Sequence, residues 1–507
     1  MKRERELGVN RWGGVGPRRN SKRREAVRAG RVLAVWLLIC GSAAAQDAAA
    51  PAGGTKLITY PAPGGAPRSS DYTVAVNGQP IDLYAAPTRY GSTATFGYFD
   101  FAGEVEVEVT AHFAASHSTS FEILPVKYGV SQREIRNGQI AFTLERPAKL
   151  TLVVSGDYTG RTLHLFANGL EQNRPSASDP NVIYFGPGYH DVGREKKWEM
   201  ALGSNQTLYL AGGAYVVGLV HASQARNVRI CGRGILAQNA DAPRERSIFM
   251  TDCEGIDISG IILHRRRAGW SGLLQRSRHI RVADYKVMSP AIWSTDGLNL
   301  ANSSDVVYDD CFFRAGDDNI AIKGGGARGQ FGGANGDPKE GPANRDILIK
   351  NCIFWSDNNN AVVLGQETKA ACYENITVRD CDVLFVRDDE DIKAALAIVC
   401  LHATDFKNIT FENIRVGPSG QLIAVYYTAN VFRIAGNQQW PGEIDGVVFR
   451  NIAATGAGSK KIRLEGWSES KKVRHVTLEN VTINGEPVTA GSGHLVVNAH
   501  VADLSFK

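Results

Sequence analysis

The sequence predicts an all-β protein, in which a small β-sandwich precedes a right-handed parallel β-helix. Three observations predict this fold. An eight-residue pattern recurs along residues 228–483, strictly alternating strands occupy the part before it, and glycine (54 of 507 residues) far exceeds methionine (four). Glycine favours turns, and a pattern that returns every few tens of residues is typical of a solenoid.

Residues 1–46 are expected to be a cleaved secretory signal. Residues 1–32 hold nine Arg and two Lys against three Glu, and the apolar run "VLAVWLLIC" (32–40) leads into Ala43-Ala44-Ala45. A basic region, a short apolar run and small residues are the parts of such a signal, and the run is too short to span a bilayer. We therefore expect a secreted or periplasmic protein without a membrane span, and we interpret residues 47–55 as a linker.

The net charge does not indicate nucleic-acid binding. The formal charge of +5 comes from the basic residues 1–32, and the rest of the chain is slightly acidic. Nucleic-acid binding proteins usually carry a concentrated basic surface, which this composition does not predict. We expect a monomer that binds neither nucleic acid nor a cofactor.

Residues 56–175 are expected to form the β-sandwich. The segment "EVEVEVTAHF" (104–113) places Val105, Val107 and Val109 on one face, and "QIAFTLERPAKLTLVVSG" (139–156) gives two more strands across a turn that contains proline. Apolar and polar residues that alternate with a period of two are typical of an antiparallel sheet with one buried face.

Residues 176–507 are expected to form the β-helix. Eight-residue segments such as "IRVADYKV", "ILIKNCIF" and "VTLENVTI" begin at 228, 256, 280, 306, 347, 376, 409, 447 and 476. Intervals of 24 to 41 residues fit coils with loops of variable length. The sequence lacks the Leu/Asn consensus of a leucine-rich repeat, and a propeller would need four antiparallel strands in each blade.

Two positions of this repeat predict ladders between coils. The fifth position is Asp or Asn in the last seven segments, at 284, 310, 351, 380, 413, 451 and 480, where such side chains suit a turn. The sixth position holds Cys311, Cys352 and Cys381. We interpret these thiols as small buried hydrophobic groups rather than a metal site, and whether two of them pair is left open.

Three carboxylates are predicted to meet at the entrances of neighbouring strands. The strands are aligned by their inward aliphatic pairs, which are Leu298–Leu300, Ile320–Ile322 and Val362–Leu364. In this register Asp296 stacks beneath Asp318, Asn360 lies one coil further, and Asp317 sits at the same entrance. Neighbouring like charges raise a carboxyl pKa, which suits a proton donor beside a base, as inverting glycoside hydrolysis requires. A Ca²⁺ site and a purely structural turn are the alternatives.

Further side chains are weaker candidates for substrate binding. One of them lies just before the first acid, and the others lie at the ends of strands on the same side as the acids. These candidates are Trp293, Lys323, Gln366, His402 and Tyr426. Each is also compatible with a core or solvent-facing position. The role of the Gly-rich insertion at 324–345 is not predicted.

The motif "TDG" followed by "GDDNIAIK" resembles the catalytic signature of glycoside hydrolase families 28 (polygalacturonases) and 49 (dextranases and isopullulanase). Family 49 is the closer match, because "VIYFGPGYHDVG" and "SNQTLYLAGGAYVVGLV" (182–220) resemble the segment that opens its β-helix. The resemblance implies a pectin-lyase-like solenoid and an inverting glycosidase. Asp317 would be the general acid, and Asp296 and Asp318 would hold and deprotonate water.

The sequence departs from family 28 where a polygalacturonase binds its substrate. The Gly-His-Gly and Arg-Ile-Lys motifs are replaced by "NNNAVVLG" and "IKAALAIV". A dextran-like α-glucan is therefore expected as substrate, and a pectic polymer is the second choice. A polysaccharide lyase and a non-enzymatic carbohydrate-binding solenoid remain as other classes. The linkage and endo or exo action are not predicted.

Overall fold

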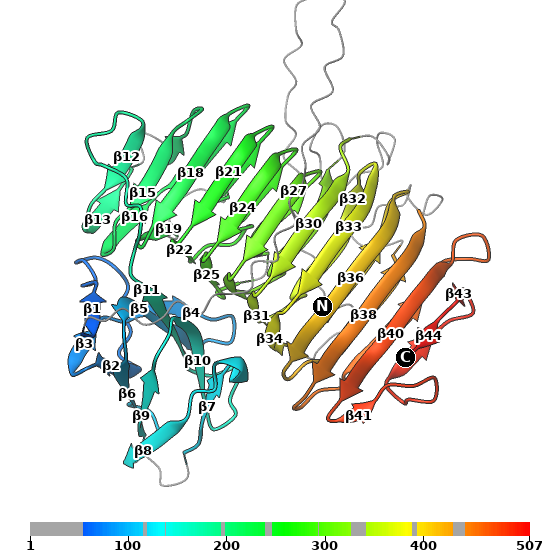
Figure 1. Ribbon diagram of the computed structural model, residues 1–507, viewed down its shortest axis with the longest axis horizontal. Helices are drawn as coiled ribbons and strands as arrows, with labels where there is room; N and C mark the ends of the chain where they lie inside the picture. Colours follow the sequence, from blue (N-terminus) through cyan, green and yellow to red (C-terminus); the bar gives the residue numbers. More distant parts are fainter. Residues whose placement is uncertain are drawn as a thin grey trace, which may run out of the picture. The chain divides into compact units, whose positions relative to one another are not determined.

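The structure, a computed structural model, describes residues 54–114, 119–136, 138–193, 198–238, 246–292, 294–325, 341–387, 393–428 and 442–507. Within these ranges two sheets form a sandwich and two sheets form a β-helix, and the helical content is one 3-10 turn at Val126–Tyr128. The predicted all-β fold is confirmed (Figure 1). The expected signal lies outside the described residues. No helix in the described part of the chain is long and apolar enough to cross a membrane.

The sandwich consists of a six-stranded and a five-stranded sheet among the described residues. The first contains β1 (Lys56–Thr59), β4 (Tyr84–Pro87), β5 (Thr93–Ala102), β7 (Phe121–Leu124), β10 (Ala148–Val154) and β11 (Thr162–Gly169). The second contains β2 (Tyr72–Val76), β3 (Gln79–Ile81), β6 (Val105–Ala111), β8 (Gln132–Arg136) and β9 (Gln139–Leu144). In β6 the residues Val105, Val107 and Val109 are buried as predicted, whereas Glu106 is exposed.

The β-helix has two sheets that run along its whole described length. The larger one bends at a corner within each coil. Its strands are β12 (Val182–Phe185), β13 (Gly188–Asp191), β15 (Thr207–Leu210), β16 (Ala214–Val217), β18 (Arg226–Gly232), β19 (Ile235–Gln238), β21 (Glu254–Ser259), β22 (Ile262–Arg265), β24 (Arg278–Ala283), β25 (Lys286–Ser289), β27 (Ser304–Asp309), β28 (Phe312–Ala315), β30 (Asn344–Lys350), β31 (Ile353–Ser356), β33 (Cys372–Arg379), β34 (Asp382–Val386), β36 (Asp405–Val416), β38 (Ile444–Ala454), β40 (Val473–Ile483), β41 (Glu486–Pro487), β43 (Val501–Ala502) and β44 (Ser505–Phe506).

The second sheet of the β-helix carries the three acids at its strand entrances. Its strands are β14 (Glu199–Ala201), β17 (Leu219–Ser223), β20 (Ile248–Thr251), β23 (Gly272–Gln275), β26 (Leu298–Ala301), β29 (Ile320–Gly325), β32 (Val362–Lys369), β35 (Ala394–Cys400), β37 (Gln421–Tyr427), β39 (Lys461–Glu465) and β42 (Leu495–Val497). Each strand pairs in parallel with the corresponding strand of the next coil, as β26 does with β29 and β29 with β32.

The repeated eight-residue segment is one corner of a coil. Its first four residues lie in one strand, its fifth residue has a positive φ, and the remainder begins the next strand or continues a bent one. At Asn413, Asn451 and Asn480 φ is 54°, 52° and 50°. Asn and Asp tolerate this left-handed conformation, which explains the choice of residue at the fifth position.

Amide side chains at this corner bond from coil to coil. Asn413 Nδ2 donates to Asp380 Oδ1 at 3.1 Å, Asn451 Nδ2 donates to Asn413 Oδ1 at 2.9 Å, and Asn480 Nδ2 donates to Asn451 Oδ1 at 2.8 Å. A second ladder, which the sequence analysis missed, lies at the residue before each segment, where Asn408 Nδ2 donates to Asn375 Oδ1 at 2.8 Å. Its sequence signal is the recurrence of Asn, Asp, His or Gly at that position.

The core of the β-helix is a stack of aliphatic and aromatic side chains from successive coils. Cys311, Cys352 and Cys381 are fully buried within it, and all three are free thiols. Burial raises the pKa of Cys311 and Cys352 well above the usual value, because the core disfavours a thiolate. These thiols therefore pack as hydrophobic groups in the structure.

Candidate active site

The predicted register of the acid-bearing strands is confirmed. Leu300 is paired with Ile322, and Ile322 in turn with Leu364. Between the coils, the Gly297 amide donates to the Asp318 carbonyl at 2.8 Å, and the Asn319 amide donates to the Asn360 carbonyl at 3.0 Å. Asp296, Asp318 and Asn360 therefore occupy corresponding positions in three successive coils.

Asp317 is half-buried and its carboxylate is held by three N–H groups. The Ser294 amide donates to Oδ2 at 2.6 Å, and Oδ1 accepts from the Asp318 amide at 3.0 Å and from Asn359 Nδ2 at 2.8 Å. The turn between Asp317 and β29 is thereby fixed in orientation.

Asp296 and Asp318 are more deeply placed, with 2% and 3% of their surface exposed. Burial raises the pKa of Asp318 to about 6, and the charge of Asp317 adds to this effect. Burial likewise raises the pKa of Asp296 well above its usual value, again with a contribution from Asp317. Asn360 Nδ2 donates to Asp318 at 2.8 Å and Asn299 Nδ2 donates to Asp296 at 2.7 Å, which partly offsets the shift. Both carboxyls therefore hold a proton to higher pH than an exposed Asp does.

Lys323 belongs to the acid cluster rather than to a free sugar-binding position. Its Nζ lies 3.9 Å from Asp296 Oδ2, 4.0 Å from Asp318 Oδ2 and 3.0 Å from Glu367 Oε2. Burial lowers the pKa of this ammonium, but the attraction of Glu367, Asp296 and Asp318 outweighs burial and raises it. Lys323 is therefore a stable cation and not a base.

The structure buries three of the other residues that were predicted to bind substrate, and the fourth lies outside the described residues. His402 is fully buried, its Nδ1 accepts from the Thr368 amide at 3.1 Å, and burial lowers its pKa to about 3. It therefore supports the packing of the coils and offers no surface to a sugar. Gln366 and Tyr426 are buried too, with the Arg463 guanidinium 4.3 Å from the Tyr426 ring. Trp293 lies outside the described residues.

Four residues around the acids were missed by the sequence analysis. Asn299 bonds Asp296, Asn359 bonds Asp317, Glu367 pairs with Lys323, and the Trp270 ring lies 4.8 Å from Lys323 Nζ. The triplet "NNN" before β32 was a usable signal, because three amides in a row at a strand entrance are unusual. Asn299 gives no such signal, since it lies within a strand among apolar residues, and Glu367 gives none because it is one of several polar residues at the end of β32.

The segment that carries Asn359 and Asn360 is anchored to the sandwich. Arg314, fully buried at β28, donates through Nε and Nη2 to both oxygens of Asp357 at 3.2 Å and through Nη1 to His164 at 2.9 Å. Tyr90 donates to the Asp357 carbonyl at 2.5 Å. Further along, the Arg89 amide donates to the Pro290 carbonyl at 3.0 Å, six residues before Asp296. Sandwich residues thus contact the segments that lead to the acids.

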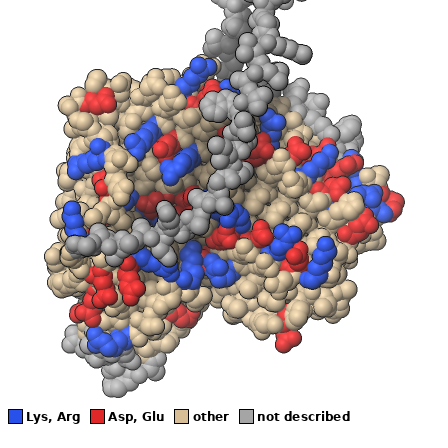
Figure 2. Space-filling view, viewed as in Figure 1, with Lys and Arg blue, Asp and Glu red and all other residues tan. Residues whose placement is uncertain are grey.

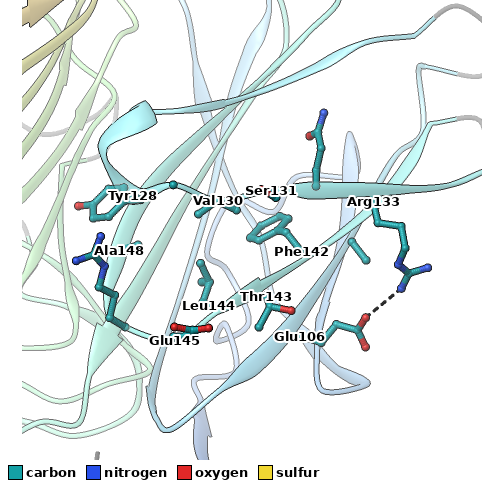
Figure 3. A pocket seen from close by; sticks show the side chains of 14 residues that line it. Glu106, Tyr128, Val130, Ser131, Arg133, Phe142, Thr143, Leu144, Glu145 and Ala148 are labelled. Carbon is teal, nitrogen blue, oxygen red and sulfur yellow. Dashed lines mark hydrogen bonds and ion pairs between the residues drawn. The ribbon is translucent and has the colours of Figure 1, made fainter. Parts of the chain in front are cut away.

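A hollow of about 650 Å³ on the sandwich contains none of the three acids. Tyr128, Phe142, Thr143 and Arg146 contribute to its lining, together with an ion pair of 3.2 Å between Arg133 and Glu106 (Figure 3). This pair is exposed and neutral overall. The group of three acids therefore lies at the strand entrances of the β-helix and outside this hollow.

The surface charges do not gather into a region of one sign on the face shown in Figure 2. Lys and Arg side chains are interspersed with Asp and Glu there. On β21, β24 and β27 the exposed charges are cross-paired, as Arg278 with Glu254 at 2.9 Å and Arg281 with Asp257 at 3.3 Å. These exposed charges are therefore paired between neighbouring coils.

Comparisons with known proteins agree with the predicted resemblance. The model of glycosyl hydrolases family 28 matches residues 233–500, which include all three acids. Dextranases of Arthrobacter sp. (strain CB-8) and Arthrobacter globiformis are 22% identical over 389 residues, covering 66% of this chain and 55% of each relative. The chain thus spans about half the length of the curated relatives it matches.

One solved structure extends the comparison to most of the chain. Dex49A from Penicillium minioluteum has a TM-score of 0.56 and 13% identity, with coverage of 89% of this chain and 96% of that one. A similarity at this identity concerns the fold, and it confirms the right-handed parallel β-helix. The family match confirms the relationship to family 28 that "TDG" and "GDDNIAIK" predict, and the sequence similarity to dextranases agrees with the resemblance to family 49.

Proposed function

Because the chain belongs to glycosyl hydrolases family 28, we propose that it hydrolyses the glycosidic bonds of a polysaccharide. The observation that carries the proposal is the group Asp296, Asp317 and Asp318, which brings three carboxyls together at neighbouring strand entrances. Hydrolysis with inversion needs one carboxyl that donates a proton and another that removes one from water. A group in which burial raises the pKa of Asp296 and Asp318 beside the less buried Asp317 meets this need.

Two assignments of the catalytic roles, proton donor and activation of water, are compatible with this group of acids. The resemblance assigns the proton donor to Asp317 and the water to Asp296 and Asp318. The raised pKa values of the buried Asp296 and Asp318 support the reverse order, in which one of them donates the proton. We adopt the first assignment, because Asp317 is the least buried of the three and a general acid must come within hydrogen-bond distance of the leaving-group oxygen.

A dextran-like α-glucan is the substrate that we propose first. The curated relatives of similar sequence are dextranases. Lys323, the cation nearest to the acids among the described residues, is engaged by Asp296, Asp318 and Glu367, so it is not free to bind a uronate carboxylate. A pectic polymer is the second candidate, supported by the family match. The basic and apolar start of the sequence supports secretion or export to the periplasm.

The test is the release of reducing ends from dextran, pullulan, polygalacturonate and pectin. We expect release from dextran, equal rates with and without EDTA, and no ultraviolet absorbance of an unsaturated sugar, because proton transfer by the three acids needs no metal and hydrolysis leaves no double bond. Growth of that absorbance, or loss of activity in EDTA that Ca²⁺ restores, would support the lyase instead. Binding to a polysaccharide without any cleavage would support the non-enzymatic solenoid.

A further inference from the structure

Lys323 places a buried positive charge beside two of the three acids. It lies on β29, opposite Ala301 of β26, and only 5% of its surface is exposed. Its Nζ is about equally far from Asp296 Oδ2 (3.9 Å) and Asp318 Oδ2 (4.0 Å). The ammonium therefore faces both carboxylates from one side and favours neither.

Glu367 and Trp270 fix the position of this ammonium. Glu367 Oε2, on β32, accepts a hydrogen bond from Nζ at 3.0 Å, and the ring of Trp270 lies 4.8 Å from Nζ. Contact with a carboxylate and with an aromatic ring stabilises a cation that is removed from water. The shortest of its ion pairs is thus the one with Glu367, which keeps Lys323 at a distance of about 4 Å from the two catalytic candidates.

Among the described residues that contact Asp296 and Asp318, none other than Lys323 places a positive charge within about 4 Å of these carboxylates. Asp317 adds a negative charge from the turn before β29, and Asn299 and Asn360 donate neutral amide hydrogen bonds. Tyr426, from β37, interacts with Asp318 and lies against Arg463, which in turn bonds Glu465 at 2.6 Å. Three carboxylates, those of Asp296, Asp318 and Glu367, therefore surround one ammonium.

We propose that Lys323 is a positioning residue for the hydrolysis: held by Glu367, its charge allows the Asp296–Asp318 pair to become negative, so that one of these carboxylates takes a proton from water. This inference rests on the proposed function. It replaces the expectation that Lys323 binds sugar hydroxyls. Without the ammonium, like charges and burial keep the pair protonated to higher pH.

The pH dependence of kcat/KM for Lys323→Met and Glu367→Gln tests the proposal, because the two variants shift it in opposite directions. The base must be ionised, so activity is lost as pH falls through its pKa. Lys323→Met removes an attractive charge, and its acid limb should move up by about one to three pH units. Glu367→Gln removes a repulsive charge and releases Lys323 toward the acids, so its acid limb should move down.

Lys350→Met is the matched control, since Lys350 pairs with Asp309 at 3.1 Å on the other sheet of the β-helix and should keep the wild-type profile. A Lys323 that only supports the fold would lower activity without displacing the limb. Unchanged limbs in both variants would overturn the proposal. If Lys323→Met does not fold, the direction of the shift in Glu367→Gln decides alone.

A measurement without substrate separates this proposal from the proposed function. The melting temperature of Lys323→Met should fall further below wild type at pH 7.5 than at pH 4, because Asp296 and Asp318 are protonated at pH 4 and then need no counter-charge. This difference is expected even if no polysaccharide is cleaved. A decrease in melting temperature that is the same at both pH values would contradict the proposed pairing of Lys323 with the two acids. If the wild type cleaves no polysaccharide but the pH-dependent decrease is observed, only the hydrolase function is contradicted.

Discussion

Asp317→Asn is expected to lower kcat/KM on the polysaccharide by about 10²- to 10⁴-fold, the range that a general acid contributes. The loss should be much smaller on an aryl glycoside with a good leaving group, because such a group departs without a proton. Asp296→Asn and Asp318→Asn should be impaired on both substrates, since water must attack whatever leaves. Steady-state kinetics on the two substrates measure the difference.

The three variants should fold, and two of them should not lose stability at neutral pH. Asp296 and Asp318 have raised pKa values in the folded state, so the stability they contribute is present below the pKa of the unfolded chain and is lost as pH rises through the folded pKa, which for Asp318 is about 6. Asp305→Asn is the control, because its side chain is 62% exposed on β27 and distant from the chemistry. A leaving-group effect that appears in Asp318→Asn and not in Asp317→Asn would assign the donor to Asp318.

Arg314→Met is expected to lower the free energy of unfolding by about 3–5 kcal/mol, the cost of leaving one member of a buried ion pair without its partner. Arg314 and Asp357 are both fully buried, and the guanidinium also bonds His164 of the sandwich. Because Asn359 and Asn360 follow Asp357 closely and bond Asp317 and Asp318, activity should fall as well. Urea unfolding, with activity measured on the folded fraction, determines both effects.

Arg278→Met is the matched control for the buried arginine. Arg278 is 58% exposed and pairs with Glu254 at 2.9 Å, and an exposed pair that solvent screens contributes little to stability. The double variant Arg314→Met/Asp357→Asn should recover part of the loss, since it removes the charge that was left alone. Equal and small effects at Arg314 and Arg278 would show that the contact between the sandwich and the Asp357 segment is dispensable.

The β-helix was predictable because the residue types that recur in each repeat are required by the geometry of the coil. The Asn and Asp residues at the fifth position indicate a left-handed corner, and the aliphatic pairs Leu298–Leu300 and Ile320–Ile322 fix the register of the strands. The second ladder was not recognised, because Asn, His, Asp and Gly share that position and no single residue type dominates it.

The composition of the acid cluster was predictable, but its surroundings were not. Spacing placed Asp296 and Asp318 on adjacent coils, yet it could not show that both are almost fully buried or that Glu367 anchors Lys323 between them. The contacts of the sandwich residues His164 and Tyr90 with Arg314 and Asp357 join positions 150 and 267 residues apart and leave no periodic signal. His402 illustrates the opposite case, since its place in the repeat suggested the cleft and its burial excludes it.

The anomeric form of the first product tests the proposed three-carboxylate hydrolysis most directly. Proton nuclear magnetic resonance of wild-type enzyme with dextran, recorded before mutarotation equilibrates the reducing ends, distinguishes the α from the β anomer. Because water is expected to attack the face opposite to the leaving group, the account predicts that the β anomer accumulates first from this α-linked polymer. Initial release of the α anomer would contradict it, since that outcome requires a covalent intermediate on one of the acids.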